Sequence, residues 1–400
     1  MARVRVFGAG ECGLPLARRL LDGGVPVTLV ADRTAEQVLN GSVTSTQVKF
    51  PRTLDLETAA GMGTWRETAP QILGIRFHLA VDAALVTTWT APFSRPAQSV
   101  DQRTALSHRM TEFVSAGGDL RITELSAAEA DRHSGDYDLT VVTRASKDLA
   151  ACFPADAARP MPDRPMRRLL AVYLDGVAPD PDGMGAYVAL PGLGEAVTTP
   201  CLVGAPGHER RADNVMFAAL PGGELDVFDE ARTPAARLDL IRALIVKYLP
   251  PELADRFRDV DLTDAGATLA GGVTPAVREP VGVLPSGAAV LGGADVVCRM
   301  DPGGAQGANN AVHCGFRYAE AILATPEGPF DREWMRATAQ PWLTEIAHPA
   351  AEWTISMLDP SPRMQELLLT AAQNPALAAA FAETFVHPAT MSDLVAGQVS

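Results

Sequence analysis

The first residues of the chain place a glycine-rich turn directly after a hydrophobic strand. Residues Val4 to Gly13 read Val-Arg-Val-Phe-Gly-Ala-Gly-Glu-Cys-Gly, and a helical pattern of apolar residues follows up to Leu21. Gly8 permits a tight turn, Gly10 lets the backbone approach a pyrophosphate, and Gly13 lets the helix pack on its strand. The N-terminus of that helix then faces the negative charge of the phosphates. This order predicts a Rossmann-like α/β domain that binds a dinucleotide.

A second hydrophobic strand, residues 25–31, ends at Asp32, and Arg33 follows it. Asp32 lies at about the distance past the glycines at which an acidic residue meets a ribose hydroxyl. A glycine pattern alone is a weak signal. The flanking strand, helix and acid together favour a nucleotide site over an ordinary glycine turn.

Composition narrows the possible partners of the chain. Its 400 residues carry a formal net charge of −14, which argues against a general attraction to nucleic acid or to anionic membranes. The five cysteines and seven histidines lack the spacing of a metal site. Because the sequence shows neither a long apolar span nor a signal-peptide pattern, we expect a cytoplasmic protein without a metal.

The rest of the chain alternates between nucleotide-domain patterns and antiparallel-sheet patterns. Short apolar runs separated by Gly and Pro clusters between residues 166 and 227 predict an antiparallel sheet, and the last 70 residues are mostly helical in pattern. We therefore expect three parts of the nucleotide domain (1–60, 96–150, 266–328), two segments of a substrate domain (61–95, 151–265) and a C-terminal helical region (329–400).

A second glycine-rich segment distinguishes between nucleotide cofactors. A strand delivers Asp295 beside Gly292 and Gly293, where its carboxylate can meet a ribityl hydroxyl. A Pro-Gly-rich turn at 301–305 then opens a helix at Gln306, whose free N–H groups suit an anionic oxygen. Reduced flavin carries its negative charge at N1 and the C2 carbonyl, so this segment favours FAD.

At this point a family resemblance becomes specific. The pieces GAGECG (8–13), ADR (31–33), GGAD (292–295) and DPGGAQGAN (301–309) resemble the FAD-binding motifs of flavoprotein monooxygenases of the para-hydroxybenzoate hydroxylase fold. Residues 269–278, the DPxxxQGAN run and residues 378–388 resemble the oxygenase component of styrene and indole monooxygenases. The similarity covers nearly the whole chain. The cofactor residues that it implies are Gly8, Gly10, Glu11, Cys12, Gly13, Asp32, Arg33, Arg103, Asp295, Pro302, Gly304, Gln306, Gly307, Ala308 and Asn309.

Two positions depart from the family pattern. Ala305 stands where the family usually has glycine, and its methyl group is expected to tighten that turn. Thr143-Arg144-Ala145 stands where one-component hydroxylases carry an Asp-Gly motif associated with FAD and NADPH. The missing motif suits an enzyme that receives flavin already reduced.

The resemblance implies a two-component flavoprotein monooxygenase. A separate NAD(P)H-dependent flavin reductase would supply reduced FAD, and the C4a-hydroperoxyflavin formed with O2 would be the oxidant. The expected reaction is epoxidation of the indole C2=C3 bond, and of styrene-type alkenes or oxidation of aryl sulfides. No acid–base residue is required, and the protein must orient the double bond and keep water out.

Six positions of the implied substrate pocket point to a branch of the family. They are Ser45, Gln47, Lys49, Ile72, Ile75 and Ala97, and five of the six resemble the indole-preferring members. Lys49 departs from both branches. Because a lysine inside an apolar pocket loses hydration, we expect its ammonium group to reach solvent or a flavin oxygen.

Two other functions stay open at this stage. One is a tailoring oxygenase for a larger indole-containing metabolite, suggested by Lys49 and by a C-terminus that looks truncated. The other is a flavin-binding sensor that has lost turnover. The sequence does not determine the oligomeric state, and a homodimer is compatible with it.

Overall fold

The computed structural model describes residues 2–397, and the half of the molecule that holds the N-terminal strand, called the first half, is built on a mostly parallel sheet. The six strands lie in the order β14-β15-β6-β1-β2-β5, and only β14 runs antiparallel to its neighbour. Their bounds are β1 (Val4–Phe7), β2 (Val27–Ala31), β5 (Asp119–Ile122), β6 (Leu139–Val142), β14 (Val281–Val283) and β15 (Ala289–Gly292).

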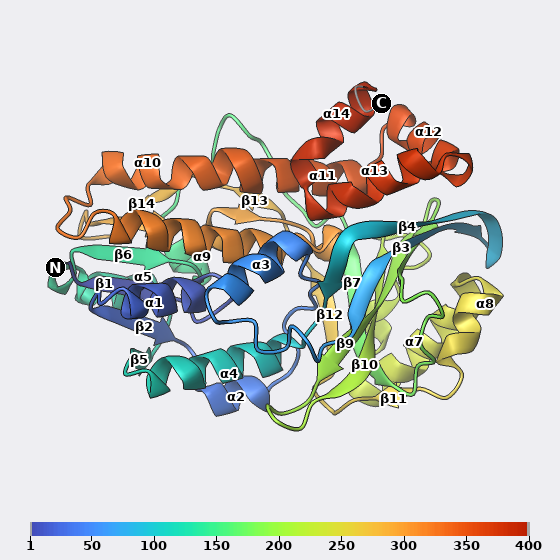
Figure 1. Ribbon diagram of the computed structural model, residues 1–400, viewed down its shortest axis with the longest axis horizontal. Coiled ribbons are helices and arrows are strands. Elements are labelled where there is room, and N and C mark those ends of the chain that lie inside the picture. The colour runs from blue at the N-terminus through green and yellow to red at the C-terminus, as the bar shows by residue number, and fades with distance from the viewer. Residues whose placement is uncertain (1, 398–400) are drawn as a thin grey trace.

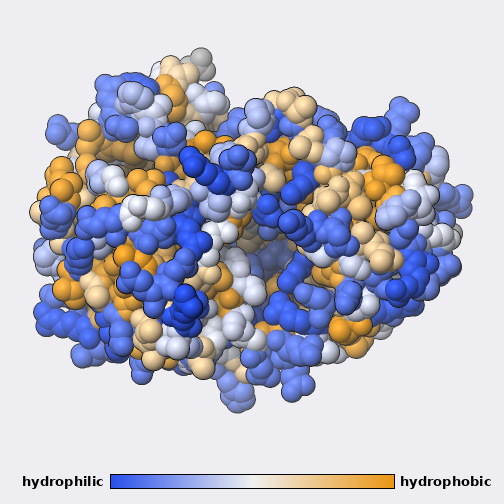
Figure 2. Space-filling view, turned by 180° about the vertical axis from the view of Figure 1, so that it is seen from behind, coloured by the Kyte–Doolittle hydropathy of each residue, from blue (hydrophilic) through white to orange (hydrophobic). Residues whose placement is uncertain are grey.

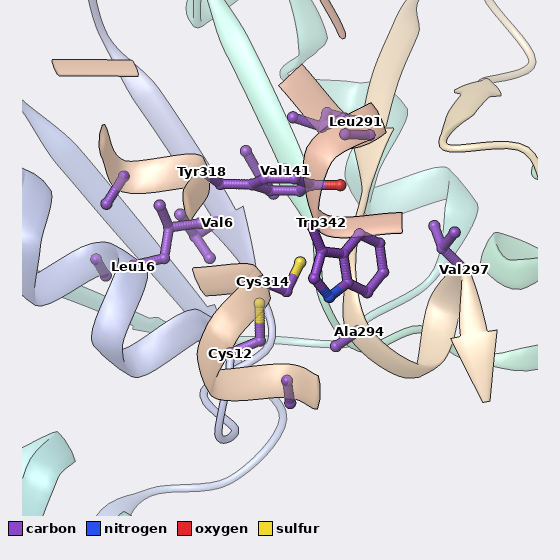
Figure 3. Close-up of a cluster of buried hydrophobic side chains, with 14 of the residues drawn as sticks. Val6, Cys12, Leu16, Val141, Leu291, Ala294, Val297, Cys314, Tyr318 and Trp342 are labelled. Carbon is purple, nitrogen blue, oxygen red and sulfur yellow. The ribbon is translucent and has the colours of Figure 1, made fainter. Parts of the chain in front are cut away.

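Helices cover this sheet, and two of them meet above the glycine turn. Helix α1 (Gly13–Asp22) packs along α9 (Gly307–Leu323), and α10 (Arg332–Trp342) lies against α9 (Figure 1). Figure 3 shows the sulfur atoms of Cys12 and Cys314 facing one another in the core that joins α1 to α9. The other helices of this half are α2 (Ala35–Leu39), α3 (Pro51–Ala59), α4 (Gln102–Ser115), α5 (Ala127–Arg132) and α6 (Lys147–Ala150).

The second half is built on an eight-stranded sheet in the order β11-β7-β10-β9-β8-β3-β4, with β12 also paired to β7. Its strands are β3 (Gln71–Val81), β4 (Ala84–Gln98), β7 (Arg168–Asp175), β8 (Gly185–Leu190), β9 (Gly194–Val203), β10 (Arg210–Ala219), β11 (Asp261–Leu262) and β12 (Thr268–Gly272). Helix α7 (Pro234–Tyr248) begins as its sequence predicts, with Thr233 as N-cap and proline in the first turn. Helix α8 (Pro251–Ala254) follows, and the small pair β13 (Ala276–Val277) and β16 (Cys298–Arg299) leads back to the first half.

The C-terminal helices lie along the second sheet and close the top of the molecule in the view of Figure 1. Helix α13 packs on β4, and Trp342 and Trp353 are buried. These tryptophans form part of the core, as their apolar surroundings in the sequence predict. The helices are α11 (His348–Leu358), α12 (Pro362–Thr370), α13 (Pro375–Val386) and α14 (Met391–Ala396).

The predicted α/β architecture is confirmed, with an inserted sheet that is antiparallel except for the parallel pair β3–β8, and with a helical C-terminal region. Two boundaries lie elsewhere than the sequence predicts. Strand β4 runs to Gln98, and β12 at Thr268–Gly272 still pairs with β7 of the second sheet. Between residues 2 and 397, no helix is long and apolar enough to cross a lipid bilayer.

Candidate functional site

The residues predicted to bind the nucleotide gather at one edge of the parallel sheet. Phe7 of β1 lies opposite Val30 of β2 and Val142 of β6, and Gly292 of β15 pairs with Val142. The loops that follow these strands therefore all start at the same edge of the sheet. Because ligands of such sheets bind outside the carboxyl ends of the strands, this edge is the expected cofactor groove.

The three glycines of the first turn have different physical roles. Gly8 has a φ of +112°, and a Cβ there would lie 2.6 Å from Cβ of Arg144. A Cβ on Gly13 would lie 1.8 Å from the Gly8 carbonyl oxygen. A Cβ on Gly10 would meet nothing within 4 Å. The protein's own backbone thus requires Gly8 and Gly13, whereas Gly10 leaves open space where a phosphate can approach.

Asp32 follows the end of β2, and its side chain is exposed. One guanidinium nitrogen of Arg144 lies 3.2 Å from Asp32 Oδ2, and Nε of Arg33 lies 4.0 Å from Asp32 Oδ1. Arg144 is one of the residues that replace the Asp-Gly motif. Because these ion pairs are solvent-exposed, they are weak, and the carboxylate stays accessible to a ribose hydroxyl.

A cavity of about 330 Å³ lies where the two sheets meet. Its walls combine the predicted cofactor residues Asp295, Pro302, Gly307 and Ala308 with the predicted pocket residues Ser45 and Gln47. Apolar residues of the second sheet form the opposite wall: Leu169, Ala171, Met216 and Leu269. Figure 2 shows that the face opposite that of Figure 1 is hollowed near its middle and rimmed largely by hydrophilic side chains.

The start of α9 fits an anionic group in this cavity. A Cβ on Gly307 would meet nothing within 4 Å, so a ligand can reach the backbone of the first turn. The first N–H groups of a helix have no intrahelical acceptor and carry the positive end of the helix dipole. The Asp295 side chain is exposed to the cavity, and desolvation by the surrounding protein raises the pKa of its carboxyl to about 6, while Arg299 opposes that rise. The cavity therefore offers apolar walls and a positive helix end, which fit the ring and the anionic edge of a reduced flavin.

Gln306 and Asn309 at the start of α9 have structural contacts instead of open side chains. Asn309 Oδ1 accepts hydrogen bonds from the Phe50 amide at 3.0 Å and the Thr53 hydroxyl at 2.7 Å, and its Nδ2 donates to the Val48 and Ala305 carbonyl oxygens. Gln306 Nε2 donates to the Phe385 carbonyl oxygen at 3.0 Å. These side chains tie the start of α9 to neighbouring segments, and contact of either residue with a cofactor stays a prediction.

The expectation that the Lys49 ammonium reaches solvent or a flavin oxygen is wrong. Lys49 Nζ lies 2.7 Å from Glu11 Oε2 and 2.6 Å from Glu57 Oε1, and its side chain is only 7% exposed. Arg109 contacts the same two carboxylates, at 3.0 Å and 2.7 Å. We call these four residues the charge cluster. Two cations and two carboxylates neutralise one another there. Their attraction offsets the desolvation cost of burying the Lys49 ammonium group.

The charge cluster also accounts for Glu11, which the motif assigns to cofactor binding. Burial acts to raise the pKa of Glu11, but Lys49 and Arg109 outweigh it and hold the pKa below its usual value. The Glu11 side chain therefore holds the glycine turn to Lys49 and Arg109, and contact of its backbone with a pyrophosphate stays a prediction.

Three other predicted cofactor residues, Cys12, Gly304 and Arg103, are packed against or bonded to other parts of the protein. Cys12 is buried against α9, and a Cβ on Gly304 would lie 2.5 Å from the Trp353 ring. Arg103 is engaged by Asp101, Asp264 and the Gly41 carbonyl oxygen through all its guanidinium N–H groups. Burial acts to lower the pKa of Arg103, but the two carboxylates outweigh it and raise the pKa. A role for these side chains at the cofactor stays a prediction.

Ile72, Ile75 and Ala97 lie in a core cluster between the second sheet and the C-terminal helices. Their exposed fractions are 2%, 6% and 0%, and Ile72 lies directly opposite Ala97 in the β3–β4 ladder. None of the three lines the 330 Å³ cavity. Their role in substrate selection stays a prediction, and they are also ordinary core residues.

The turn before α9 carries strain that the sequence signals. Ala305 has φ = 55° and ψ = 21°, the left-handed region that favours glycine. We expect Ala305→Gly to raise the free energy of unfolding by about 0.5–1 kcal/mol, because the methyl group no longer opposes this conformation. Urea unfolding of the purified variant measures this, and a loss of stability would contradict it.

Three residues at the site were not predicted from the sequence. Glu57 and Arg109 complete the charge cluster, and Asp301 is buried at the cavity with Oδ2 unpartnered among residues 2–397. Burial raises the pKa of Asp301 to about 6. Only Asp301 had a signal, its place in the DPGGAQGAN run.

Comparison with known proteins gives relatives that are similar in sequence to this chain. Residues 146–256 match the family model described as "Styrene monooxygenase A putative substrate binding domain". The chain is 26% identical over 333 residues to styrene monooxygenase StyA of Pseudomonas fluorescens, which covers 80% of this chain and 77% of the relative. StyA of a second Pseudomonas species gives the same identity and coverage.

Solved structures with the same fold are flavin enzymes. The flavin-dependent brominase Bmp2 has a TM-score of 0.69 at 13% identity, covering 96% of this chain and 93% of the brominase. PqsL of Pseudomonas aeruginosa, described as a probable FAD-dependent monooxygenase, has a TM-score of 0.63 at 11% identity, covering 94% and 98%. Aklavinone-11 hydroxylase, solved with FAD, has a TM-score of 0.58 at 16% identity, covering 89% and 68%. The comparisons support FAD as the cofactor and a flavin-dependent oxidoreductase as the class: the chain is similar in sequence to styrene monooxygenases and has the fold of flavin-dependent monooxygenases and halogenases.

Proposed function

We propose that this protein is the oxygenase component of a two-component flavin-dependent monooxygenase that epoxidises indole at C2=C3, and styrene-type alkenes as well. A separate NAD(P)H-dependent flavin reductase in the cytoplasm supplies reduced FAD. The observation that carries the proposal is the shared cavity, because one space is lined both by the start of α9 and by Ser45 and Gln47.

The described residues at the carboxyl edge of the parallel sheet suit the two ends of FAD. Gly10 leaves open space for a pyrophosphate, and Asp32 stays accessible to a ribose. The open backbone at Gly307 and the helix dipole of α9 receive the anionic edge of the ring. When bound, reduced FAD supplies the electrons that activate O2 for insertion of one oxygen atom.

The protein's own contribution is orientation and exclusion of water. The apolar wall of Ala171, Met216 and Leu269 can hold an aromatic ring against the cofactor face. Gln47 is fixed in place, since its amide donates to the Val100 carbonyl oxygen and accepts from Gln102. A fixed wall lowers the entropic cost of aligning the double bond.

The preference for indole over styrene is the finer part of the proposal. It is supported by the resemblance of Ser45, Gln47, Ile72, Ile75 and Ala97 to the indole-preferring branch. The alternative of a larger indole-containing substrate depended on a charged Lys49 at the pocket. Because the ammonium is neutralised inside the charge cluster, that reason no longer applies.

Product analysis tests this function directly. The purified protein is mixed with chemically reduced FAD, O2 and either indole or styrene, with no other electron donor. We expect indigo from indole and styrene oxide from styrene. Release of hydrogen peroxide without any oxygenated product from either substrate would contradict a monooxygenase and favour a flavin sensor.

A further inference from the structure

A second cavity, of about 440 Å³, lies between the second sheet and the helices α11 and α12. We call it the α12 cavity, and we call the 330 Å³ cavity at the start of α9 the α9 cavity. The walls of the α12 cavity are largely apolar, and they include Phe77, Leu79, Tyr187, Ala189, Met357 and Leu368. On the side of α12 the cavity reaches solvent, since Leu369 in its lining is 50% exposed. A ligand can therefore enter it from outside.

The two cavities lie on the same face of the second sheet. Residues directly opposite one another in neighbouring strands point to the same side of a sheet. Met216, which lines the α9 cavity, lies opposite Val197 of β9, and Val197 lies opposite Tyr187 of β8. Tyr187 in turn lies opposite Phe77 of β3, and both line the α12 cavity. One row of side chains thus runs from the floor of one cavity to the floor of the other.

Val197, in the middle of this row, is only partly buried. Its strand β9 lies in the middle of the sheet, between β10 and β8. The other face of β9 is covered, because Ala196 belongs to a core cluster that includes residues of α7. The exposed part of Val197 must therefore lie on the face that carries the two cavities. Open space extends over the sheet from one cavity toward the other.

The turn at 301–305 forms the partition between the cavities. The residues of this turn that line the α9 cavity are Asp301, Pro302 and Ala305. A Cβ on Gly303 would lie 2.9 Å from Leu358 Cδ2 and 3.6 Å from Glu195 Oε1. Leu358 and Glu195 both line the α12 cavity. At this point the cavities are separated by a single turn of the chain.

The charges beside the partition are paired. Arg167 Nε lies 2.9 Å from Glu195 Oε1, and Arg167 Nη2 donates to the Leu358 carbonyl oxygen at 2.7 Å. Arg167 therefore ties the sheet to the end of α11. Between residues 2 and 397, the other charged residue of the lining is Asp359, which is exposed at the rim. Because an ionic ligand would lose hydration without gaining a free counter-ion inside, the α12 cavity suits an uncharged molecule.

We propose that the α12 cavity is a second binding site for an uncharged aromatic molecule, which holds the substrate at the entrance to the α9 cavity. This inference rests on the proposed function, which supplies the substrate class. The rings of Phe77 and Tyr187 are stacked, with centroids 6.0 Å apart and planes 11° from parallel. Together with Leu79 and Leu368 they offer apolar surface, and burying that surface under an aromatic ring favours binding.

Calorimetric titration of the FAD-loaded protein with indole tests the assignment without turnover. The titration is made at pH 8, because burial raises the pKa of Glu195 to about 7 against the opposing effect of Arg167, and the carboxylate is then ionised. We expect about two indole molecules per wild-type chain, one in each cavity. Ala189→Trp should leave about one, because Ala189 is a partly buried wall residue and its replacement fills the α12 cavity. Ala189→Ser keeps the volume and is the matched control.

Initial rates of indole oxidation, with a flavin reductase supplying reduced FAD, test the place of this site on the route. Ala189→Trp is expected to raise KM for indole about tenfold and to leave kcat within about twofold, since residue 189 does not line the α9 cavity. Ala189→Ser should leave both constants within about twofold of the wild type.

A single indole per wild-type chain overturns the inference, and this result needs no variant to fold. An unchanged stoichiometry or an unchanged KM in Ala189→Trp also overturns it. If Ala189→Trp does not fold, Leu368→Trp fills the cavity from α12 and takes its place. Failure of the proposed function looks different: reduced FAD then gives no oxygenated product from indole or styrene. If product forms while only one indole binds, only this inference is wrong.

Discussion

Lys49→Met is expected to lower the free energy of unfolding by about 3–5 kcal/mol, the usual cost of removing one partner from a buried ion pair. In the variant, Glu11 and Glu57 share the single cation of Arg109. One carboxylate is then buried without its own counter-ion. Urea unfolding at pH 7 measures the loss. Lys147→Met, which removes an exposed ammonium, is the control and should change stability by less than about 0.5 kcal/mol.

The pH dependence and a second substitution check the cause of that loss. In the wild type, the lowered pKa of Glu11 contributes stability above its usual pKa, and this contribution is lost as pH falls through the lowered value. In Lys49→Met, burial is less opposed and raises the pKa of Glu11, so the deficit should shrink as the pH is lowered. Adding Glu57→Gln restores neutrality and should recover about half of the loss or more. A double variant less stable than the single one would contradict the charge explanation.

Gly10→Val is expected to abolish most FAD binding while leaving the fold intact. Its side chain would enter the open space where the pyrophosphate approaches, so we expect the affinity for FAD to fall on the order of 100-fold or more, about 2.7 kcal/mol. The free energy of unfolding should change by less than about 1 kcal/mol, because a Cβ there meets no protein atom. Flavin fluorescence titration gives the affinity. Gly135→Ala, at another open glycine remote in sequence, is the control.

In contrast to Gly10→Val, Gly13→Ala is expected to lower the stability of the fold itself. Its Cβ would lie 1.8 Å from the Gly8 carbonyl oxygen, so helix α1 must move off its strand. We expect a loss of about 3 kcal/mol in stability. Normal FAD affinity in Gly10→Val, or normal stability in Gly13→Ala, would show that the turn does not work as its geometry indicates.

Local segments of the fold could be predicted from the sequence because their causes are contiguous. The strand, glycines and helix between Val4 and Asp22 carry their signals within one short window, and so does the start of α7 at Thr233 and Pro234. The short apolar runs of β7 to β10, separated by Gly and Pro clusters, likewise predict a sheet. What they leave open is which face meets a cavity, because alternation assigns two faces without saying what covers each one.

Side-chain roles at the site were harder to predict because they depend on distant partners. Lys49 has its counter-ions at residues 11 and 57, and Arg109 joins them from α4. No spacing rule connects these positions. Asn309 has the position of a cofactor residue in its motif, yet its amide reaches a segment about 260 residues earlier in the chain. For such residues the motif specifies where the backbone lies, and the tertiary fold decides what the side chain does.

Because of the hydrogen bonds of Asn309, a substitution there is expected to disturb cofactor binding and substrate binding together. One amide fixes both the helix end that would meet the flavin and the Val48–Phe50 segment next to the pocket. Substitutions at this position cannot be sorted by kinetics into cofactor mutants and substrate mutants, since either class of defect brings the other with it. A descendant of this protein that changes its substrate is therefore expected to change pocket residues of the second sheet and to keep Asn309.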